Sequence, residues 1–331
     1  MHNLKFKDKR KKKKNKMPKT VLVTGGSGLI GQGIKMFISQ NKQDENYIFL
    51  SSKDCDLTKY EETRNIFIKY QPSYVIHLAA KVGGLYANMK YPVEFYRINV
   101  LMNDNIMQLC KEFNVEKLIS CLSTCIFPDK TSYPIDEKMI NDSPPHTSNE
   151  AYSYAKRMID VMNRSYNKEY NCNFTSIIPT NVYGSYDNFH LEDAHVLPAL
   201  IHKAYLAKKN NTDFVIYGSG RPLRQFIYNK DLGELIIYVL KNYTEVDPII
   251  LSVDEEDEVS IKDIAYMIAA AFDIPFYRIV FDTSKSDGQY KKTATNKKLR
   301  KLLPNYKFTS LKDGIYETCK WFKENYNISR K

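Results

Sequence analysis

Tyr152 and Lys156, in the segment NEAYSYAKRM, are four residues apart, so on a helix they would lie one turn apart on the same side. A tyrosine hydroxyl keeps its proton up to about pH 10, but a nearby ammonium lowers that pKa. Such a pair can transfer a proton near neutral pH. Tyr154 has no lysine four residues later, and it is the weaker candidate. Because the chain has 25 tyrosines, a chance pairing is the alternative interpretation.

A cysteine, Cys125, follows the apolar run KLISCLS and precedes the loop FPDKTSYPIDE. A cysteine beside a buried strand usually fills space, as we expect for Cys121 in the same run. Where the surroundings favour the thiolate, a cysteine instead becomes a base or a nucleophile. The residues around Cys125 leave both interpretations open.

The segment TGGSGLIG places Gly25, Gly28 and Gly31 directly after a predicted strand and before a predicted helix. Gly25 permits a tight turn, Gly28 lets the backbone approach a pyrophosphate, and Gly31 lets the helix pack closely on the sheet. Unpaired N–H groups at the start of that helix attract phosphate. A glycine triplet alone is a weak signal, but between a strand and a helix it predicts a dinucleotide site.

Short apolar runs alternate with helical patterns in the first half of the chain. Strands are predicted at 21–24, 47–52, 74–80, 117–123 and 174–180, and helices near 59–70, 88–113 and 150–170. This alternation predicts a Rossmann-type doubly wound α/β fold with a parallel sheet. Beyond residue 182 the pattern indicates a smaller mixed α/β region packed over the carboxyl ends of the sheet. We therefore divide the chain into a basic tail (1–18), a dinucleotide-binding Rossmann domain (19–182) and a mainly substrate-binding region (183–331).

The net charge of +11 is concentrated at the start of the chain. Residues 1–16 carry nine Lys or Arg and one Asp, which leaves +3 for all the others. A block of like charge is typical of a disordered, solvated tail. Nuclear localisation or weak polyanion binding by the tail remains open, and we expect no nucleic-acid binding by the folded body.

The composition also limits where the protein works. No apolar stretch approaches the length of a membrane span, and the charged N-terminal residues do not resemble a secretory signal. Six cysteines are scattered without CxxC pairs, so we expect neither a disulfide framework nor a metal site. These features favour the cytoplasm, with no membrane partner.

The glycine spacing G-x-x-G-x-x-G is similar to that of the extended short-chain dehydrogenases/reductases. In that superfamily a serine at the position of Ser123, which ends the run KLISCLS, hydrogen-bonds a substrate carbonyl. Over residues 19–328 the chain further resembles the GDP-L-fucose synthase family, through the segments HLAAKVGGLYAN, STCIFP, IPTNVYGSYDNFH, HVLPALIHK, GSGRPLRQFIY and SKSDGQYKK. The lysine-rich tail has no counterpart in that family.

The resemblance implies an NADPH-dependent epimerase/reductase acting on GDP-4-keto-6-deoxy-D-mannose, in the biosynthesis of GDP-fucose. The family inverts carbons 3 and 5 of the hexose with a cysteine and a histidine, which match Cys125 and His195. Thiol and imidazole both titrate near neutral pH and can exchange proton duties. NADPH then reduces the 4-keto group while Tyr152 supplies a proton. Ser123 polarises the carbonyl, and Lys156 holds the nicotinamide ribose and tunes Tyr152.

Cofactor residues follow from the same resemblance. An acidic-aliphatic pair near the adenine matches Asp56 and Leu57. Ser51, Ser52 and Lys53 could accept a 2′-phosphate, which favours NADP over NAD, although some relatives carry a basic residue where this chain has Ser27. The expected cofactor contacts are Gly25, Gly26, Ser27, Gly28, Leu29, Ile30, Gly31, Lys53, Asp56, Leu57, Ala79, Ala80, Asn99, Tyr152, Lys156, Pro179, Asn181, Val182 and His195.

For the nucleotide sugar, the resemblance implies that Arg224 binds phosphate, with Lys203 and Asn181 alongside, because a pyrophosphate requires cationic or N–H donors. Tyr217 occupies the place of a tryptophan that some relatives have beside the nucleotide. Asp287 could accept hydrogen bonds from hydroxyl groups. The alternative for Arg224 is a structural ion pair.

Other functions remain possible at this point. A related 4-epimerase or 4,6-dehydratase would share the fold, but a dehydratase needs a carboxylate pair beside Ser123, and the segment STC has none. A non-catalytic nucleotide-sensing scaffold would typically lose the tyrosine or the lysine. Members of the family usually form dimers through two long helices, expected here at 88–113 and 150–170.

Overall fold

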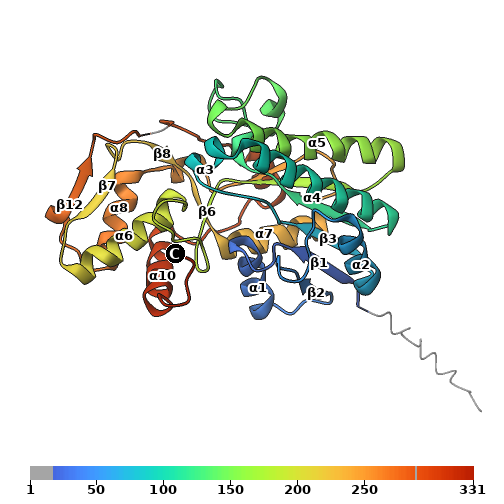
Figure 1. The fold of residues 1–331 in the computed structure, drawn as a ribbon, viewed down its shortest axis with the longest axis horizontal. Coiled ribbons are helices and arrows are strands. Elements are labelled where there is room, and N and C mark those ends of the chain that lie inside the picture. Colours follow the sequence, from blue (N-terminus) through green and yellow to red (C-terminus); the bar gives the residue numbers. More distant parts are fainter. Residues whose placement is uncertain (1–17, 288) are drawn as a thin grey trace, which may run out of the picture.

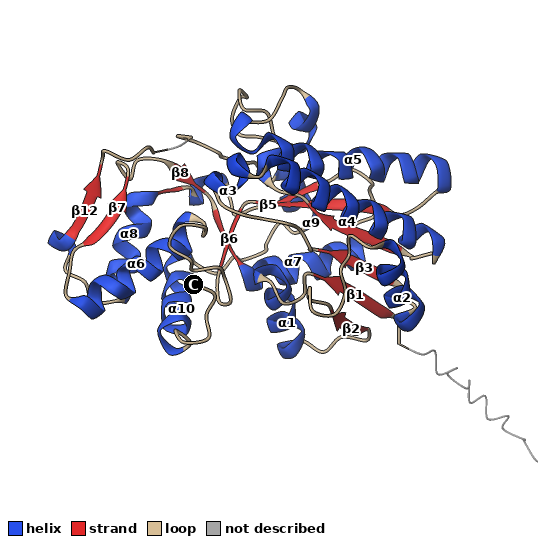
Figure 2. Ribbon diagram, viewed as in Figure 1, coloured by secondary structure: helices blue, strands red, loops and turns tan. Residues whose placement is uncertain are grey.

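Within the described residues, 18–287 and 289–331, the computed structural model has a central sheet of six parallel strands in the order β10-β5-β4-β3-β1-β2 (Figures 1 and 2). The predicted basic tail, except Pro18, lies outside these residues. The strands are β1 (Thr20–Thr24), β2 (Asn46–Phe49), β3 (Tyr74–His77), β4 (Lys117–Cys121), β5 (Phe174–Pro179) and β10 (Ile249–Leu251). Parallel strands covered on both faces are almost continuously apolar, which explains why these runs could be found in the sequence.

Helices cover both faces of the sheet, as the predicted doubly wound fold requires. One layer contains α1 (Leu29–Gln40) and α7 (Asn229–Asn242), and the other contains α2 (Tyr60–Tyr70), α4 (Pro92–Glu112) and α5 (Glu150–Tyr170). Side chains alternate along each strand, so Leu118 of β4 packs in the core beneath α4 and α5, while its neighbour Ile119 packs in the core beneath α7.

The first helix after the glycine loop is held against α7 by a contact of backbone on backbone. A Cβ atom on Gly33 would lie 1.9 Å from the carbonyl oxygen of Asn229, and one on Gly233 would lie 2.4 Å from the carbonyl carbon of Gly33. No side chain fits at either position, because real Cβ contacts are never this short. The cofactor helix therefore depends on a helix from the second half of the chain.

Two features of the fold differ from the sequence prediction. The helix predicted over 88–113 is wrong as one element, because the chain forms α3 (Leu85–Lys90) and then α4. Pro92 is the first residue of α4 and has no N–H to continue the preceding helix. In addition, α7 and β10 complete the first unit although they follow residue 182, where the sequence predicted mainly the substrate-binding region.

The remaining elements form a second core beyond the carboxyl ends of the main sheet (Figure 1). Helices α6 (Val196–Asn210), α8 (Ile261–Ala271) and α10 (Leu311–Glu324) pack together there. Short strand pairs join them, namely β6 (Asn181–Tyr183) with β9 (Phe226–Tyr228), β7 (Phe214–Tyr217) with β12 (Ile279–Asp282), and β8 (Leu223–Arg224) with β11 (Val259–Ser260). Helix α9 (Lys297–Leu302) instead packs on the core beneath α7, through Leu299. In the described part of the chain, no helix is both long and apolar enough to span a bilayer.

Candidate active site

Ser123 and Cys125 lie where β4 leaves the sheet. Ser123 precedes the 3-10 helix η1 (Thr124–Ile126), and its hydroxyl oxygen accepts a hydrogen bond from the backbone N–H of Cys125, at 3.4 Å. Both side chains are half-buried. Cys121, four residues earlier, is buried, and burial raises the pKa of its thiol to about 11. The two thiols are therefore in different environments, and Cys125 is the more accessible.

The predicted pair on α5 faces the same strand end. The Lys156 ammonium is 2% exposed and donates a hydrogen bond to the carbonyl oxygen of Cys121 at 2.9 Å, while burial lowers its pKa. The Tyr152 ring packs edge-on against Phe95 of α4, with ring centroids 6.3 Å apart. Burial, and next the charge of Cys125, raise the pKa of Tyr152 well above 10. The hydroxyl of Tyr152 therefore keeps its proton at neutral pH and is set up as a proton donor.

His195 is linked electrostatically to these residues by Lys292, which was not predicted from the sequence. His195 precedes the first turn of α6. The protein packed around it and then the positive charge of Lys292 lower its pKa, although the residue as a whole is exposed to solvent. Burial also lowers the pKa of Lys292, an effect that the charge of Cys125 opposes. The charge of Lys292 thus lowers the pKa of His195, and the charge of Cys125 acts on the pKa of Lys292.

Lys292 is placed by contacts that no local pattern reveals. On either side of Ala294, the chain pairs with Ile135: the N–H of Ile135 donates to the Thr293 carbonyl, and the N–H of Thr295 donates to the Ile135 carbonyl, each at 2.8 Å. The Gln225 side chain donates to the Ala294 carbonyl and accepts from its N–H. These bonds tie the segment to the loop after Cys125. In the sequence, Lys292 is one of many lysines.

The glycine loop has the shape that a pyrophosphate requires. Gly25 has a φ of +66°, and a Cβ atom there would lie 2.8 Å from the Ala79 nitrogen. Within the described residues, no side chain caps the start of α1, so its first N–H groups point out of the helix without a capping partner. A Cβ on Gly28 would meet Gly25 alone, at 3.2 Å. The loop therefore fits a bound phosphate group.

The residues predicted to bind the adenosine end of the cofactor follow β2. Some of their polar atoms already form hydrogen bonds with one another. The Asp54 carboxylate accepts from the N–H and the hydroxyl of Ser51, both at 2.7 Å, which leaves Lys53 as an exposed cation. Asp56 accepts from the N–H and hydroxyl of Thr58 and is exposed, whereas Leu57 is buried in the core. Lys53 is thus the freer of these groups to meet a 2′-phosphate.

Other predicted cofactor residues line the ends of neighbouring strands. Ala79 and Ala80 follow β3 and are half-buried, with the Ala79 N–H 3.3 Å from the Thr24 hydroxyl oxygen. Asn99 of α4 is buried, and its side-chain amide bonds both backbone groups of Lys81 at 3.0 Å. Asn99 therefore organises the loop after β3 rather than presenting a free amide. Pro179 ends β5, and Val182 lies in β6.

Of the residues predicted to bind the nucleotide sugar, Lys203 and Tyr217 contact each other, whereas Asn181 and Arg224 contact backbone carbonyl groups. The Lys203 ammonium of α6 lies 3.2 Å from the ring centroid of Tyr217, which is exposed at the end of β7. Asn181 donates to the Gln225 carbonyl at 2.8 Å. Arg224 donates to the carbonyls of Leu223, Tyr290 and Gln289, so its contacts are to backbone rather than to the carboxylate of the ion pair considered as the alternative.

Asp287 is held by its own loop contacts. Its carboxylate accepts from the N–H and the hydroxyl of Ser219, at 2.5 and 2.6 Å. These bonds close the turn at Gly218, whose φ is +89°. In this structure Asp287 therefore stabilises the loop beside Tyr217.

A parallel sheet, a glycine loop and a Tyr152–Lys156 pair at the end of the strand that leads into Ser123 define a dinucleotide-dependent enzyme of the Rossmann class. The sequence matches the model of the NAD dependent epimerase/dehydratase family over residues 21–253. The predicted fold class is thereby confirmed.

Individual relatives of known name identify the family within this class to which the chain belongs. The chain is 59% identical over 314 residues to the GDP-L-fucose synthase of Dictyostelium discoideum, an alignment that covers 95% of this chain and 98% of that protein. It is 51% identical over 321 residues to the probable GDP-L-fucose synthase of Drosophila melanogaster, covering 95% and 100%. The solved structure of a GDP-L-fucose synthetase from Naegleria fowleri bound to NADP is 48% identical, with a TM-score of 0.92 and 96% of each chain covered. The chain belongs to the GDP-L-fucose synthase family, as the sequence resemblance predicted.

Proposed function

We propose that this chain converts GDP-4-keto-6-deoxy-D-mannose to GDP-L-fucose, by inverting carbons 3 and 5 of the hexose and then reducing the 4-keto group with NADPH. The observation that carries this proposal is the placement of Lys156, whose ammonium is bonded at 2.9 Å to the end of the strand that leads into Ser123 and Cys125. A thiol, an imidazole and a tyrosine hydroxyl are the groups that two proton transfers and one reduction require.

The cofactor would lie across the carboxyl ends of β1, β2 and β3. The glycine loop and the open start of α1 would hold its pyrophosphate, and Lys53 its 2′-phosphate, which is the reason to favour NADP. Lys156 would bind the ribose beside the nicotinamide. When bound, NADPH supplies the hydride for carbon 4.

Epimerisation depends on the acidity of the protons next to the ketone. Ser123 would donate a hydrogen bond to the 4-keto oxygen, which stabilises the negative charge that develops there. Cys125 and His195 would then remove and return protons at carbons 3 and 5 from opposite faces of the ring. The thiolate is the basic form that Cys125 would use in this step.

Reduction uses the other half of the site. Tyr152 would give its proton to the 4-keto oxygen as the hydride arrives, and the charge of Lys156 favours the tyrosinate that results. On the nucleotide side, Lys203, Arg224 and Asn181 would bind the pyrophosphate, with Tyr217 beside the base and Asp287 near the ribose hydroxyls. Arg224 can do so with the N–H groups that its backbone contacts leave unused.

The activity can be tested in two incubations of the purified protein. With GDP-4-keto-6-deoxy-D-mannose and NADPH, we expect cofactor oxidation and GDP-L-fucose as the product. With NADPH withheld in heavy water, we expect deuterium at carbons 3 and 5, read by NMR. GDP-mannose, which has no ketone, is the control and should exchange nothing. Oxidation without exchange would identify a simple 4-ketoreductase and contradict the proposal.

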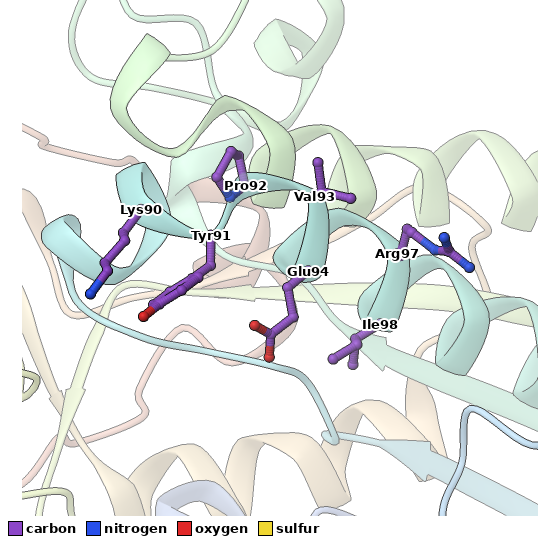
Figure 3. A pocket seen from close by; sticks show the side chains of 7 residues that line it. All are labelled: Lys90, Tyr91, Pro92, Val93, Glu94, Arg97 and Ile98. Carbon is purple, nitrogen blue, oxygen red and sulfur yellow. The ribbon is translucent and has the colours of Figure 1, made fainter.

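We also propose a homodimer in which α4 and α5 of two copies pack together. Val93, 69% exposed, and Leu101 lie on the outer side of α4, and Met158 is exposed on α5. A surface pocket at the start of α4 includes Val93 and Arg97 (Figure 3). Exposed apolar side chains gathered on two adjacent helices are typical of an interface.

The dimer predicts the effect of a charge on this face. Val93→Glu combined with Leu101→Glu should convert the protein to a monomer in sedimentation velocity, because two carboxylates per subunit would be buried without partners. Tyr277→Glu, at a side chain that is 85% exposed outside these helices, is the matched control and should stay dimeric. An unchanged sedimentation coefficient in the double variant would place the interface elsewhere.

We place the reaction in the cytoplasm, since all six cysteines carry free thiols. Free thiols in this number suit a reducing compartment.

A further inference from the structure

The loop that carries His195 is held by the end of the described chain. Residues 184–195 connect β6 to α6, and His195 is the last of them. Near its middle, Phe189 is fully buried, and its ring packs on Phe322 of α10, with centroids 4.3 Å apart. The carbonyl of Phe189 is also hydrogen-bonded to the His202 ring at 2.8 Å. The loop is therefore fixed on one side by α6 and α10.

The segment 325–331, which follows α10, fixes the other side. Its Arg330 pairs with Asn188 of the loop as in a parallel strand, and the Phe189 N–H donates to the Arg330 carbonyl at 2.7 Å. The Arg330 guanidinium donates to the Tyr186 carbonyl, also at 2.7 Å. Figure 1 shows the end of the chain beside α10 and α6. Arg330 thus contacts the loop at Tyr186, Asn188 and Phe189, on the backbone path that leads to His195.

The contact between Arg330 and the loop also has an electrostatic part, because the loop contains a buried carboxyl group. Asp187 is 5% exposed; one of its oxygens accepts from the Asn188 N–H at 2.7 Å, and the other is buried without a hydrogen-bond partner among the described residues. Burial raises its pKa to about 7, and the charge of Arg330 opposes that shift. An uncompensated buried carboxylate destabilises the conformation that contains it. The Arg330 charge therefore favours the loop conformation seen here.

We propose that Arg330 is a positioning residue for epimerisation, which holds the 184–195 loop so that His195 faces the hexose. The proposal rests on the proposed role of His195. Among the described residues, no hydrogen bond or ion pair joins Arg330 to the cofactor loop or to Tyr152, Lys156 or Ser123, so it acts on the proton transfers and leaves the cofactor in place.

The test compares epimerisation in four variants of the whole protein. Arg330→Ala should lower the rate of product formation and of exchange with inversion about tenfold, with the NADPH Kd unchanged. Arg330→Lys keeps the charge and a donor and should recover most of the rate. Lys331→Ala removes a neighbouring charge that contacts Tyr326 rather than the loop, and it should behave like the unaltered protein. If Arg330→Ala does not fold, Arg330→Gln, which keeps a donor without the charge, replaces it.

The decisive comparison is made in a His195→Asn background. There Arg330→Ala should cause no further loss of the residual exchange, because the residue it positions is gone. A second tenfold loss would show that Arg330 acts in another way, and an Arg330→Ala protein with full activity would also overturn the proposal. If His195→Asn alone kept full epimerisation, the role of His195 in the proposed function would fail instead.

Discussion

Cys125→Ser should abolish most deuterium incorporation at carbons 3 and 5 while leaving the binding of NADPH unchanged. Serine has the size to keep the turn after β4, but its hydroxyl does not ionise near neutral pH and cannot serve as the base. General acid–base groups contribute about 10²- to 10⁴-fold to a rate, so we expect a loss of at least about 100-fold in exchange. The measurement is NMR of the recovered nucleotide sugar after incubation in heavy water.

Cys172→Ser provides the matched control for this variant. Cys172 is also a free, half-buried thiol, but it lies between α5 and β5, away from the end of β4. It should exchange at the rate of the unaltered protein. If Cys125→Ser exchanged at that rate as well, the thiol would have no part in the chemistry, and the packing of Cys125 on the core would be its whole role.

Tyr152→Phe should show the opposite pattern, with reduction lost and exchange retained. The phenyl ring can keep the edge-on contact with Phe95, so the fold should be preserved. Because burial holds the pKa of Tyr152 well above 10, the hydroxyl is protonated at neutral pH, and its removal takes away the proton that the 4-keto oxygen receives. NADPH oxidation should fall about 10²- to 10⁴-fold.

The control for the tyrosine is its neighbour on the same helix. Tyr154→Phe keeps the ring beside the Arg157 guanidinium and should oxidise NADPH normally. In the unaltered protein, the rate of reduction should decline only when the pH rises through the raised pKa of Tyr152, since the acid form is the active one. A Tyr152→Phe protein that lost exchange and reduction equally would show that both steps share one proton donor.

The sequence predicted the framework of the site better than its electrostatics. Apart from the edge strand β2, the strands of the main sheet before residue 182 are buried almost throughout, so each leaves an apolar run that can be read directly. Tyr152 and Lys156 are local neighbours on one helix, and Ser123 and Cys125 are local neighbours after one strand. β10 was missed because three residues are too few to show a period.

Lys292 could not be predicted because its position depends on long-range contacts. Its segment is held to the loop after Cys125 because Ala294 is bonded to Gln225 and its neighbours to Ile135, and these residues are far apart in the chain. Arg224 and Asp287 were singled out for a ligand, but the hydrogen bonds that they make within the protein depend on the folded loops. Their roles toward the nucleotide stay predictions.

The glycine contact between α1 and α7 also sets an order of events during synthesis. The helix that opens the cofactor loop has its partner surface at Gly233, and β5 lacks its outer neighbour until Ile249–Leu251 is made. A ribosome that has released only the first 182 residues has therefore released an incomplete sheet with a bare edge. The nucleotide-binding half reaches its final form only after most of the polypeptide has left the exit tunnel, so it matures together with the substrate half rather than ahead of it.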